Sequence, residues 1–345
     1  MKISVIIHVY NKARYLNNLL SDLLRQTFAE YECILIDDGS VDGSGEICDN
    51  ISKLDNRFRT FHLINGGVSN ARNYGICQSE GDYITFIDAD DRLYPDYLSN
   101  LFRCIIENEV DLVISGLEKY WDGSDKKECI HPPYFGKYNK DIILPQFAQI
   151  QKDTGIFGFC VAKIFRKDLV RHVKFDSSLS LAEDFDFYLN VYRKVHTFYF
   201  DDKCYYRYLQ CADKSSSTIA DNQIDYLAQL KIKLRFKNFL FEEEAYANDN
   251  KQIIVEMISN YVFFVLFHSS RKNIHTNFIE LRRMIVTEAV ELKGKNVLQK
   301  WILLLFKRKQ LMAIKLTLLM YRKLSALAKK PKDAVIRIIC KAIRI

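Results

Sequence analysis

The chain has 345 residues, of which 48% are hydrophobic and 27% charged, and a formal net charge of +7, as is typical of a soluble globular protein with a sizeable core. Its longest apolar stretches are interrupted by charged or amide side chains, so we expect no membrane-spanning helix, and the apolar run after Met1 is too short for a secretory signal. The nine cysteines are scattered, odd in number and without a CxxC pair, which favours reduced thiols in the cytosol over a disulfide framework or a zinc site.

In chain order, the first third of the sequence alternates short apolar runs with helical patterns. The sequence predicts strands at 3–9, 31–38, 59–64, 83–88 and 111–116, separated by helices at 12–26, through Ile47, Ile51 and Leu54, at 68–78 and at 97–109. Apolar strands separated by helices predict an α/β fold with a mostly parallel sheet and helices on both faces. In such a sheet ligands bind beyond the carboxyl ends of the strands, and polar residues gather there after three of the predicted strands.

The remainder of the chain has a different pattern of apolar and polar residues. An acidic helix start at 180–189 and an aromatic, strand-like segment at 197–209 stand in a region without regular rhythm, and after it the pattern is helical. The expected division is one domain at 1–220, with halves at 1–116 and 117–220, followed by a helical, basic region at 221–345.

The stretch YITFIDADD (83–91) places Asp88 and Asp90 at the end of a buried strand. Two carboxylates separated by one residue suit a hard divalent cation, above all where substrate phosphates complete its coordination. The structural alternative is that they cap the helix that begins near Pro95 or are solvated. A DxD pair alone is common by chance, so its meaning depends on what surrounds it.

Two other motifs lie at predicted ends of strands and starts of helices. In IDDGSVDGSG (36–45), Asp38 offers a carboxylate to a ligand, while Ser40 or Asp42 caps the next helix. In NGGVSNARNYGI (65–76), two glycines open a helix that carries Arg72 one turn in, an arrangement suited to an anion. Each motif also has a structural explanation, a helix cap for the first and a surface salt bridge for the arginine of the second.

Together, SVIIHVYN, DDGSVDGS, GVSNARNYGI and FIDADD, in this order, resemble the family 2 glycosyltransferases with the GT-A fold. The resemblance is close over residues 1–120 and looser to about residue 215. It implies these contacts with a nucleotide-sugar donor and a Mn²⁺ or Mg²⁺ ion: Val9, Tyr10 and Asp38 with the base, Arg72 near the base and phosphates, Asp88 with the ribose, and Asp90, supported by Asp88, with the metal. Relatives usually show proline where this chain has His8, to which we assign no role.

The second half of the chemistry needs a carboxylate that takes the proton of the attacking sugar hydroxyl. The stretch SLAEDFDFYLN (180–190) puts Glu183 and Asp184 where a loop meets a helix, at the positive end of its dipole, and capping alone is the structural alternative. The resemblance implies Asp184 as the base, with Glu183 in support and Asp186 in reserve. It also implies Lys163 near the acceptor or the diphosphate, although a structural lysine is an equal interpretation.

The resemblance therefore implies an inverting, metal-dependent glycosyltransferase that moves one sugar from a nucleotide diphosphate, expected to be UDP, to a lipid-linked glycan in bacterial surface-polysaccharide synthesis. The QxxRW motif of processive synthases is absent, which favours one sugar per encounter. A nucleotidyltransferase would show a glycine-rich loop after the first strand, which HVYNKARYL lacks, and a receiver-like module would carry its acid pair there. A non-catalytic partner subunit stays open, although the DxD and ED motifs are intact.

The last segment of the chain is strongly basic. Residues 301–345 hold twelve lysines and arginines against one acid, so the first 300 residues are net acidic. Apolar residues recur among these bases at helical spacing, which favours docking on an anionic membrane surface from the cytoplasmic side. The alternative is that the apolar stripe packs on the catalytic domain or on a second subunit of a homo-oligomer. Nucleic acid is not expected as a partner, because no aromatic platform is interleaved with the charge.

Overall fold

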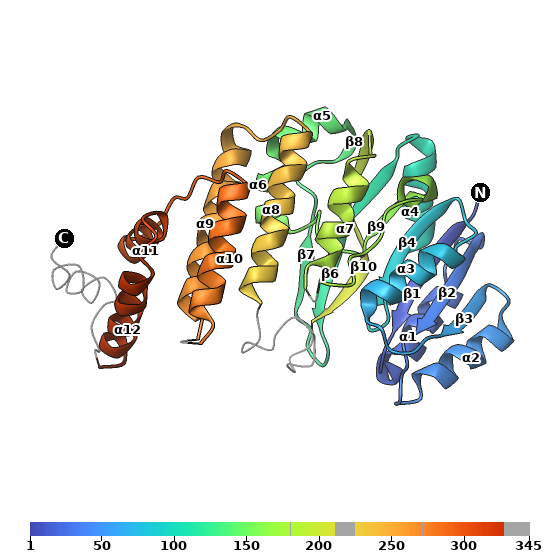
Figure 1. The fold of residues 1–345 in the computed structure, drawn as a ribbon. Helices are drawn as coiled ribbons and strands as arrows, with labels where there is room; N and C mark the ends of the chain where they lie inside the picture. Colours follow the sequence, from blue (N-terminus) through green and yellow to red (C-terminus); the bar gives the residue numbers. More distant parts are fainter. Residues whose placement is uncertain (180, 211–224, 271, 328–345) are drawn as a thin grey trace. The chain divides into compact units, whose positions relative to one another are not determined.

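The computed structural model describes residues 1–179, 181–210, 225–270 and 272–327, and the chain forms two compact units, residues 1–223 and 224–345. The first unit contains the sheet and the second is helical (Figure 1). The elements of the first unit are β1 (Ile3–Val9), α1 (Ala13–Leu24), β2 (Tyr31–Asp37), α2 (Ser44–Leu54), β3 (Phe58–His62), α3 (Val68–Gln78), β4 (Tyr83–Asp88), β5 (Arg92–Leu93), α4 (Tyr97–Glu107), β6 (Leu112–Trp121), β7 (Lys127–Ile130), β8 (Gly136–Asn139), α5 (Lys140–Ile143), α6 (Phe147–Thr154), β9 (Lys163–Arg166), α7 (Glu183–Tyr192) and β10 (Thr197–Gln210), with short 3₁₀ turns at Leu144–Gln146 and Lys167–Val170.

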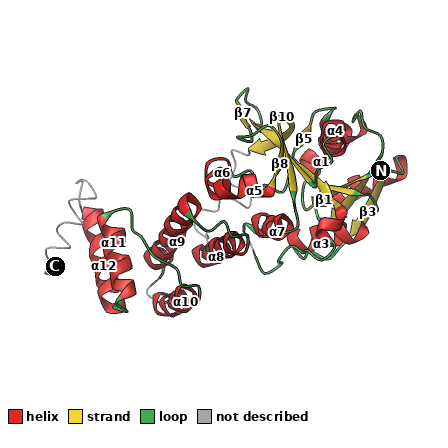
Figure 2. Ribbon diagram, turned by 90° about the horizontal axis from the view of Figure 1, so that it is seen from above, coloured by secondary structure: helices red, strands yellow, loops and turns green. Residues whose placement is uncertain are grey.

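Four of these strands form a parallel sheet in the order β3–β2–β1–β4. Strands β1 and β2 are buried along almost their whole length, which explains their continuous apolar sequences. The register places Val9 beside Asp37 and His8 beside Asp88, so the carboxyl ends of β1, β2 and β4 meet at one edge. Helices α1 and α4 cover one face of the sheet and α3 and α7 the other (Figure 2). The expected α/β fold with helices on both faces is thereby confirmed.

The second half of the sheet is mixed in direction. Strand β9 lies between β4 and β6 and is antiparallel to both, while β10 lies beyond β6 and runs parallel to it. The sequence pattern predicted that the strand at 111–116 closes a parallel series, and it did not predict β9. That strand, KIFR, has only four residues, too few for an alternation of apolar and polar positions to stand out.

Close packing fixes α3 and α7 on one face of the sheet. A Cβ at Gly75 would overlap the side chain of Ile6, so this glycine lets α3 lie directly against β1. On the same face the rings of Phe175 and Phe187 stack with centroids 3.9 Å apart, and the ring of Phe86 on β4 meets both edge-on. The first residues of α3 and α7 are consequently held near the carboxyl edge of the sheet.

The described residues of the second unit form α8 (Tyr226–Glu242), α9 (Asn248–His268), α10 (Ile274–Thr287), α11 (Val297–Lys307) and α12 (Leu311–Leu327). Polar contacts join its helices as well as apolar ones: the side-chain amide of Gln299 donates to Asn260 across 2.7 Å, and the indole N–H of Trp301 donates to Thr317 across 3.4 Å. Among the described residues, no helix has both the length and the apolar character that crossing a bilayer requires.

The basic tail predicted at 301–345 is only partly described. In α11 and α12 the apolar side chains of Trp301, Ile302, Phe306, Ile314 and Leu318 are buried. Much of the apolar stripe in the described residues is therefore buried, which neither interpretation of the sequence expected in this form. The portion from residue 328 onward, which includes Pro331, lies outside the described residues.

Candidate active site

The loop after β1 is held by the loop after β2. Asn11 has a left-handed backbone, with φ of 52°, and its N–H donates to the hydroxyl of Ser40 across 3.0 Å. The next two N–H groups donate to Ser44 (2.8 Å) and Asp42 (3.0 Å). Ser40 thus binds the first loop, whereas the sequence predicted Ser40 or Asp42 as the cap of the following helix. Asp42 also accepts from the N–H of Ser44 at the start of α2, but the N-cap position is Gly43, which has no side-chain cap, so neither residue is the predicted cap.

Asp38 is a buried carboxylate that joins three segments. Its two oxygens accept the N–H groups of Gly66 (2.8 Å) and Gly67 (2.9 Å), and its own N–H donates to the carbonyl of Val9 across 2.9 Å. It therefore fixes the start of α3 beside the ends of β1 and β2. Tyr10, the next residue along from Val9, has an exposed ring, with 41% of its surface accessible.

His8 lies between Asp38 and Arg72. Its Nε2 atom is 3.4 Å from a carboxylate oxygen of Asp38, but it makes no hydrogen bond to a described residue. Burial lowers the pKa of His8, and the positive charge of Arg72 lowers it further, while Asp38 opposes the shift. The imidazole is consequently neutral at pH 7.

Arg72 is the centre of the site. Its guanidinium donates to Asp88 on β4 across 3.0 Å and to Asp184 on α7, and it lies 3.7 Å from Glu183. Burial works against the charge of this side chain, but the carboxylates around it, Asp184 foremost, keep the pKa of Arg72 above its ordinary value. The ring of Phe175 supports the guanidinium from one side, 5.4 Å from its centroid. One arginine thus joins two acidic motifs that are about a hundred residues apart in the chain.

Asp184 lies in the first turn of α7, after Ala182, which has a left-handed backbone. Burial raises the pKa of Asp184 to about 7, Glu183 and Asp88 add to the rise, and Arg72 opposes it. A carboxylate whose pKa lies close to neutral pH is suited to accept and release a proton. Asp186, the reserve candidate, is buried further along the first turn of the same helix.

The DxD stretch contains three acids with different surroundings. Asp90 forms an ion pair with the ammonium of Lys12, with 2.5 Å between nitrogen and oxygen. Asp91 is fully buried and accepts from the hydroxyl of Tyr206 and the N–H of Leu209 on β10. The same hydroxyl of Tyr206 accepts from the N–H of Asp88. Asp91 therefore holds the turn against β10, and only Asp88 and Asp90 offer oxygens to a ligand.

The predicted lysine of the site is engaged with the protein. Lys163 on β9 is buried, donates to the carbonyl of Phe159, and has its ammonium 4.6 Å from the ring centroid of Tyr188. Burial lowers the pKa of Lys163 to about 7, and the charge of Asp184 limits the fall.

Arg207 on β10 is also engaged with the protein. It donates to Glu118 across 2.8 Å and lies between the rings of Tyr94 and Tyr120. Its segment is part of β10 as far as Gln210, and the stretch 211–217 lies outside the described residues.

Sequence reasoning missed Tyr208, which follows Arg207 on β10. Burial raises the pKa of the Tyr208 phenol, and the negative charges of Asp88, Asp91 and Asp90 raise it further. The signal in the sequence was its place in the aromatic run YYRYL, where period-two alternation puts Tyr206 and Tyr208 on the same side of the strand.

Residues 4–173 match the family described as Glycosyl transferase family 2. Among curated proteins, glycosyltransferase GlyG of Streptococcus pneumoniae is 42% identical over 187 residues, 51% of this chain and 60% of that protein, and the uncharacterized glycosyltransferase EpsJ of Bacillus subtilis is 32% identical over 198 residues, 56% of each. The chain thus spans little more than half the length of these relatives. Among solved structures, S. aureus TarS 1–349 in complex with UDP-GlcNAc aligns over 94% of this chain and 92% of its own, with a TM-score of 0.64 and 20% identity, a likeness of fold.

Proposed function

The chain belongs to glycosyl transferase family 2 through residues 4–173 and has a GT-A fold, and from this premise we propose that it is an inverting glycosyltransferase that moves one sugar from a UDP-sugar to a glycan acceptor. The observation that carries the proposal is the position of Arg72, whose guanidinium binds both Asp88 at the sheet edge and Asp184 at the start of α7. A sugar transfer needs a site for the donor phosphates and a group that accepts a proton. Arg72 contacts a candidate residue for each, so a single side chain separates the two.

The nucleotide base is assigned to the edge formed by Val9, Tyr10 and Asp38. The exposed ring of Tyr10 offers a face for stacking. Asp38 already accepts two backbone N–H groups, but an ionised carboxylate has about four acceptor positions and can take another N–H from a base. TarS, which shares this fold, has been solved with UDP-GlcNAc and with UDP, and this prompts the choice of uridine.

Asp90 and Asp88 are the residues that would hold a divalent cation. They supply only carboxylate oxygens, the donors that Mg²⁺ and Mn²⁺ prefer. Such an ion supplies positive charge to the departing diphosphate. Lys12, 2.5 Å from Asp90, is the cation that now faces this carboxylate, and it has to give up this contact when another cation binds there.

Asp184 is assigned as the general base. As the acceptor hydroxyl oxygen bonds to the anomeric carbon of the donor, its proton passes to the Asp184 carboxylate, and the bond from that carbon to the diphosphate oxygen breaks. Arg72 orients the carboxylate through their hydrogen bond. Lys163, whose protonated form is stabilised by the charge of Asp184, contributes positive charge on the same side when it is protonated.

The test is a titration of UDP-, GDP- and TDP-sugars with and without Mn²⁺, on the wild type, on Asp90→Ala and on Asp122→Ala. Asp122 is a control because its carboxylate is exposed and pairs only with the exposed Arg14 among described residues. We expect one nucleotide to bind in a metal-dependent way, and Asp90→Ala alone to lose that dependence. Absence of binding by the wild type would contradict the assignment and favour a non-catalytic partner subunit.

We assign a lipid-linked acceptor, and a position at the cytoplasmic face of the membrane, on the evidence of α12. Its side chains Met312, Leu316 and Leu319 are exposed at helical spacing, close in sequence to the exposed bases at 307–309. Removal of 301–345 is not a clean test, because it also removes the buried Trp301 and Ile302. The double variant Met312→Gln, Leu316→Gln should lose sedimentation with phosphatidylglycerol vesicles, whereas Ile279→Gln on α10, equally exposed, should keep it. Unchanged sedimentation of the double variant would refute docking through α12.

A further inference from the structure

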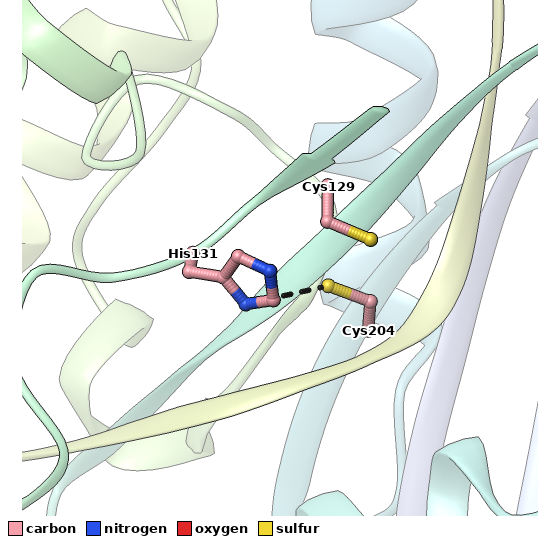
Figure 3. Close-up of side chains that lie close together, drawn as sticks. All are labelled: Cys129, His131 and Cys204. Atoms are coloured by element: carbon pink, nitrogen blue, oxygen red, sulfur yellow. Dashed lines mark hydrogen bonds between the residues drawn. The ribbon is translucent and has the colours of Figure 1, made fainter. Parts of the chain in front are cut away.

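Three sulfur and nitrogen side chains converge on the side of the sheet where β7 and β10 flank β6 (Figure 3). Cys129 lies on β7 opposite Glu118 of β6, and His131 follows directly after the end of β7. Cys204 comes from β10, in the segment between Asp201 and Tyr206 where the register with β6 shifts. The three residues belong to one unit, and the side chains point toward one another.

A glycine makes room for this convergence. A Cβ at Gly116 of β6 would lie 2.8 Å from the sulfur of Cys204, closer than such atoms approach in proteins. The irregular segment of β10 brings Cys204 over this glycine, toward the β6–β7 hairpin. The close approach of Cys204 to β6 thus depends on the glycine at position 116 and on the register shift in β10. Regular strand pairing requires neither of them.

The distances between the three side chains suit a tetrahedral metal site. One ligand atom from each residue, two sulfurs and a ring nitrogen, lie within 4.8 Å of one another. The Nδ1 atom of His131 is 3.7 Å from the sulfur of Cys204, and zinc bonds of about 2.3 Å to sulfur and about 2.0 Å to nitrogen at a tetrahedral angle separate two ligands by ~3.5 Å. Small movements of the exposed Cys129 and His131 side chains would close the remaining gap.

We propose that Cys129, His131 and Cys204 bind one zinc ion. Two thiolates and an imidazole are a typical soft and borderline ligand set for zinc, and a water molecule completes four-coordination. Binding releases the two thiol protons. The Nδ1 proton, which His131 now donates to the carbonyl of Asp202 across 2.7 Å, moves to Nε2 so that the metal takes its place.

The sequence favoured free cysteines because no CxxC pair occurs. The ligands come instead from a C-x-H pair and from a cysteine 73 residues away from the histidine, brought together by strand pairing. The ion would fasten the β6–β7 hairpin to β10 two residues before Tyr206, whose hydroxyl holds Asp91 and the N–H of Asp88. Its role is therefore structural, and it does not depend on the function proposed above.

The test uses the full chain without an affinity tag, purified under reducing conditions. We expect one zinc per chain by elemental analysis. Replacement by Co²⁺ should give the thiolate-to-cobalt absorption in the near ultraviolet together with tetrahedral bands in the visible. Cys129→Ser and Cys204→Ser should lose both signals, His131→Gln should weaken them, and Cys77→Ser, an exposed cysteine on α3, should leave them unchanged.

A second measurement keeps the proposal testable if one serine variant folds poorly. Zinc added to chelator-treated wild type should raise the midpoint of thermal unfolding, and the rise should be absent in Cys129→Ser, whose side chain is exposed and whose loss leaves no cavity. Cobalt bands that persist in Cys129→Ser would overturn the proposal. So would a Cys129–Cys204 disulfide that forms once the reductant is removed and whose renewed reduction is not followed by zinc uptake, since the pair would then be a redox couple.

Discussion

The two halves of the sheet unit control their charged groups in different ways. At the edge formed by β1, β2 and β4, each carboxylate has a local partner: Asp38 has two backbone N–H groups, Asp90 has Lys12, and Asp88 has Arg72. On the side formed by β9 and α7, burial has the largest influence on ionisation and brings the pKa of both Lys163 and Asp184 to about 7. The first region is ordered by pairing and the second is tuned by desolvation, so changes in the two should have effects of different kinds.

The largest expected effect is on the desolvated side. Asp184→Asn should lower the transfer rate by about 10²–10⁴-fold, because one positioned base contributes that much, while donor affinity stays within a factor of a few. The measurement is kcat together with donor binding by calorimetry, with Asp122→Asn as the surface control. A variant with full activity would remove Asp184 from the role of base.

The next effect breaks the link between the two halves. Arg72→Gln leaves Asp88 and Asp184 without their shared counter-charge and should cost about 3 kcal/mol of the free energy of unfolding, at the low end for a buried ion pair because both carboxylates keep some contact with water. Urea unfolding measures it. Arg14→Gln, which removes an exposed pair, should change the free energy by less than about 1 kcal/mol. Equal losses in the two variants would show that Arg72 is not a structural centre.

A third prediction tests desolvation itself through pH. With the pKa of Asp184 raised to about 7, the carboxyl is protonated below that pH and cannot act as a base. The value of kcat/KM should therefore rise about tenfold per pH unit up to neutrality and then level off. Glu183 adds to the raised pKa, so Glu183→Gln should shift this rise to lower pH. The assignment of Asp184 as the base would be contradicted if the rise in kcat/KM did not shift in Glu183→Gln. It would also be contradicted if the rise in the wild type had no midpoint between about pH 6 and 8.

The smallest effect belongs to the paired edge. Lys12→Met removes the ammonium that faces Asp90, and the carboxylate should then bind Mn²⁺ up to about fivefold more tightly, since a partly exposed ion pair contributes about 0.2–1 kcal/mol. Titration of Mn²⁺ by its paramagnetic effect on water relaxation measures the change. Weaker binding would mean that Lys12 assists the metal site by positioning the loop.

The same division explains what the sequence could predict. The strands at 3–9 and 83–88 and the helix at 68–78 were predicted with their observed bounds. Each is a continuous segment, and the spacing of its apolar residues indicates which of them are buried. The polar residues that adjoin these segments could therefore be assigned to one edge of the sheet from their positions in the chain. The contact of Arg72 with Asp184 spans 112 residues, and the sequence did not predict it, since family resemblance implied only the separate roles of the two residues.

Other features had no local signal. Asp91 received no role from the sequence, because its contact with Tyr206 depends on β10, more than a hundred residues later. Strand β9 was too short to be seen, and its insertion changed the second half of the sheet from parallel to mixed. The Cys129, His131 and Cys204 cluster required both strand pairing and a break in its register. Such features arise from tertiary packing, which a pattern in one segment does not contain.

Because Asp88 and Asp184 share Arg72, protonation of Asp184 and binding of a donor should influence each other. A donor that draws Asp88 away leaves the guanidinium to Asp184 and lowers the pKa of that carboxyl, because the opposing positive charge is no longer divided. Thermodynamic linkage requires the converse: a proton on Asp184 weakens its hold on Arg72 and strengthens the pairing with Asp88 that the donor has to displace. Donor affinity should then rise with pH through the same midpoint as the rate. With a donor bound, the enzyme would hold its base ionised, whereas at neutral pH about half of the molecules without a donor would keep it protonated.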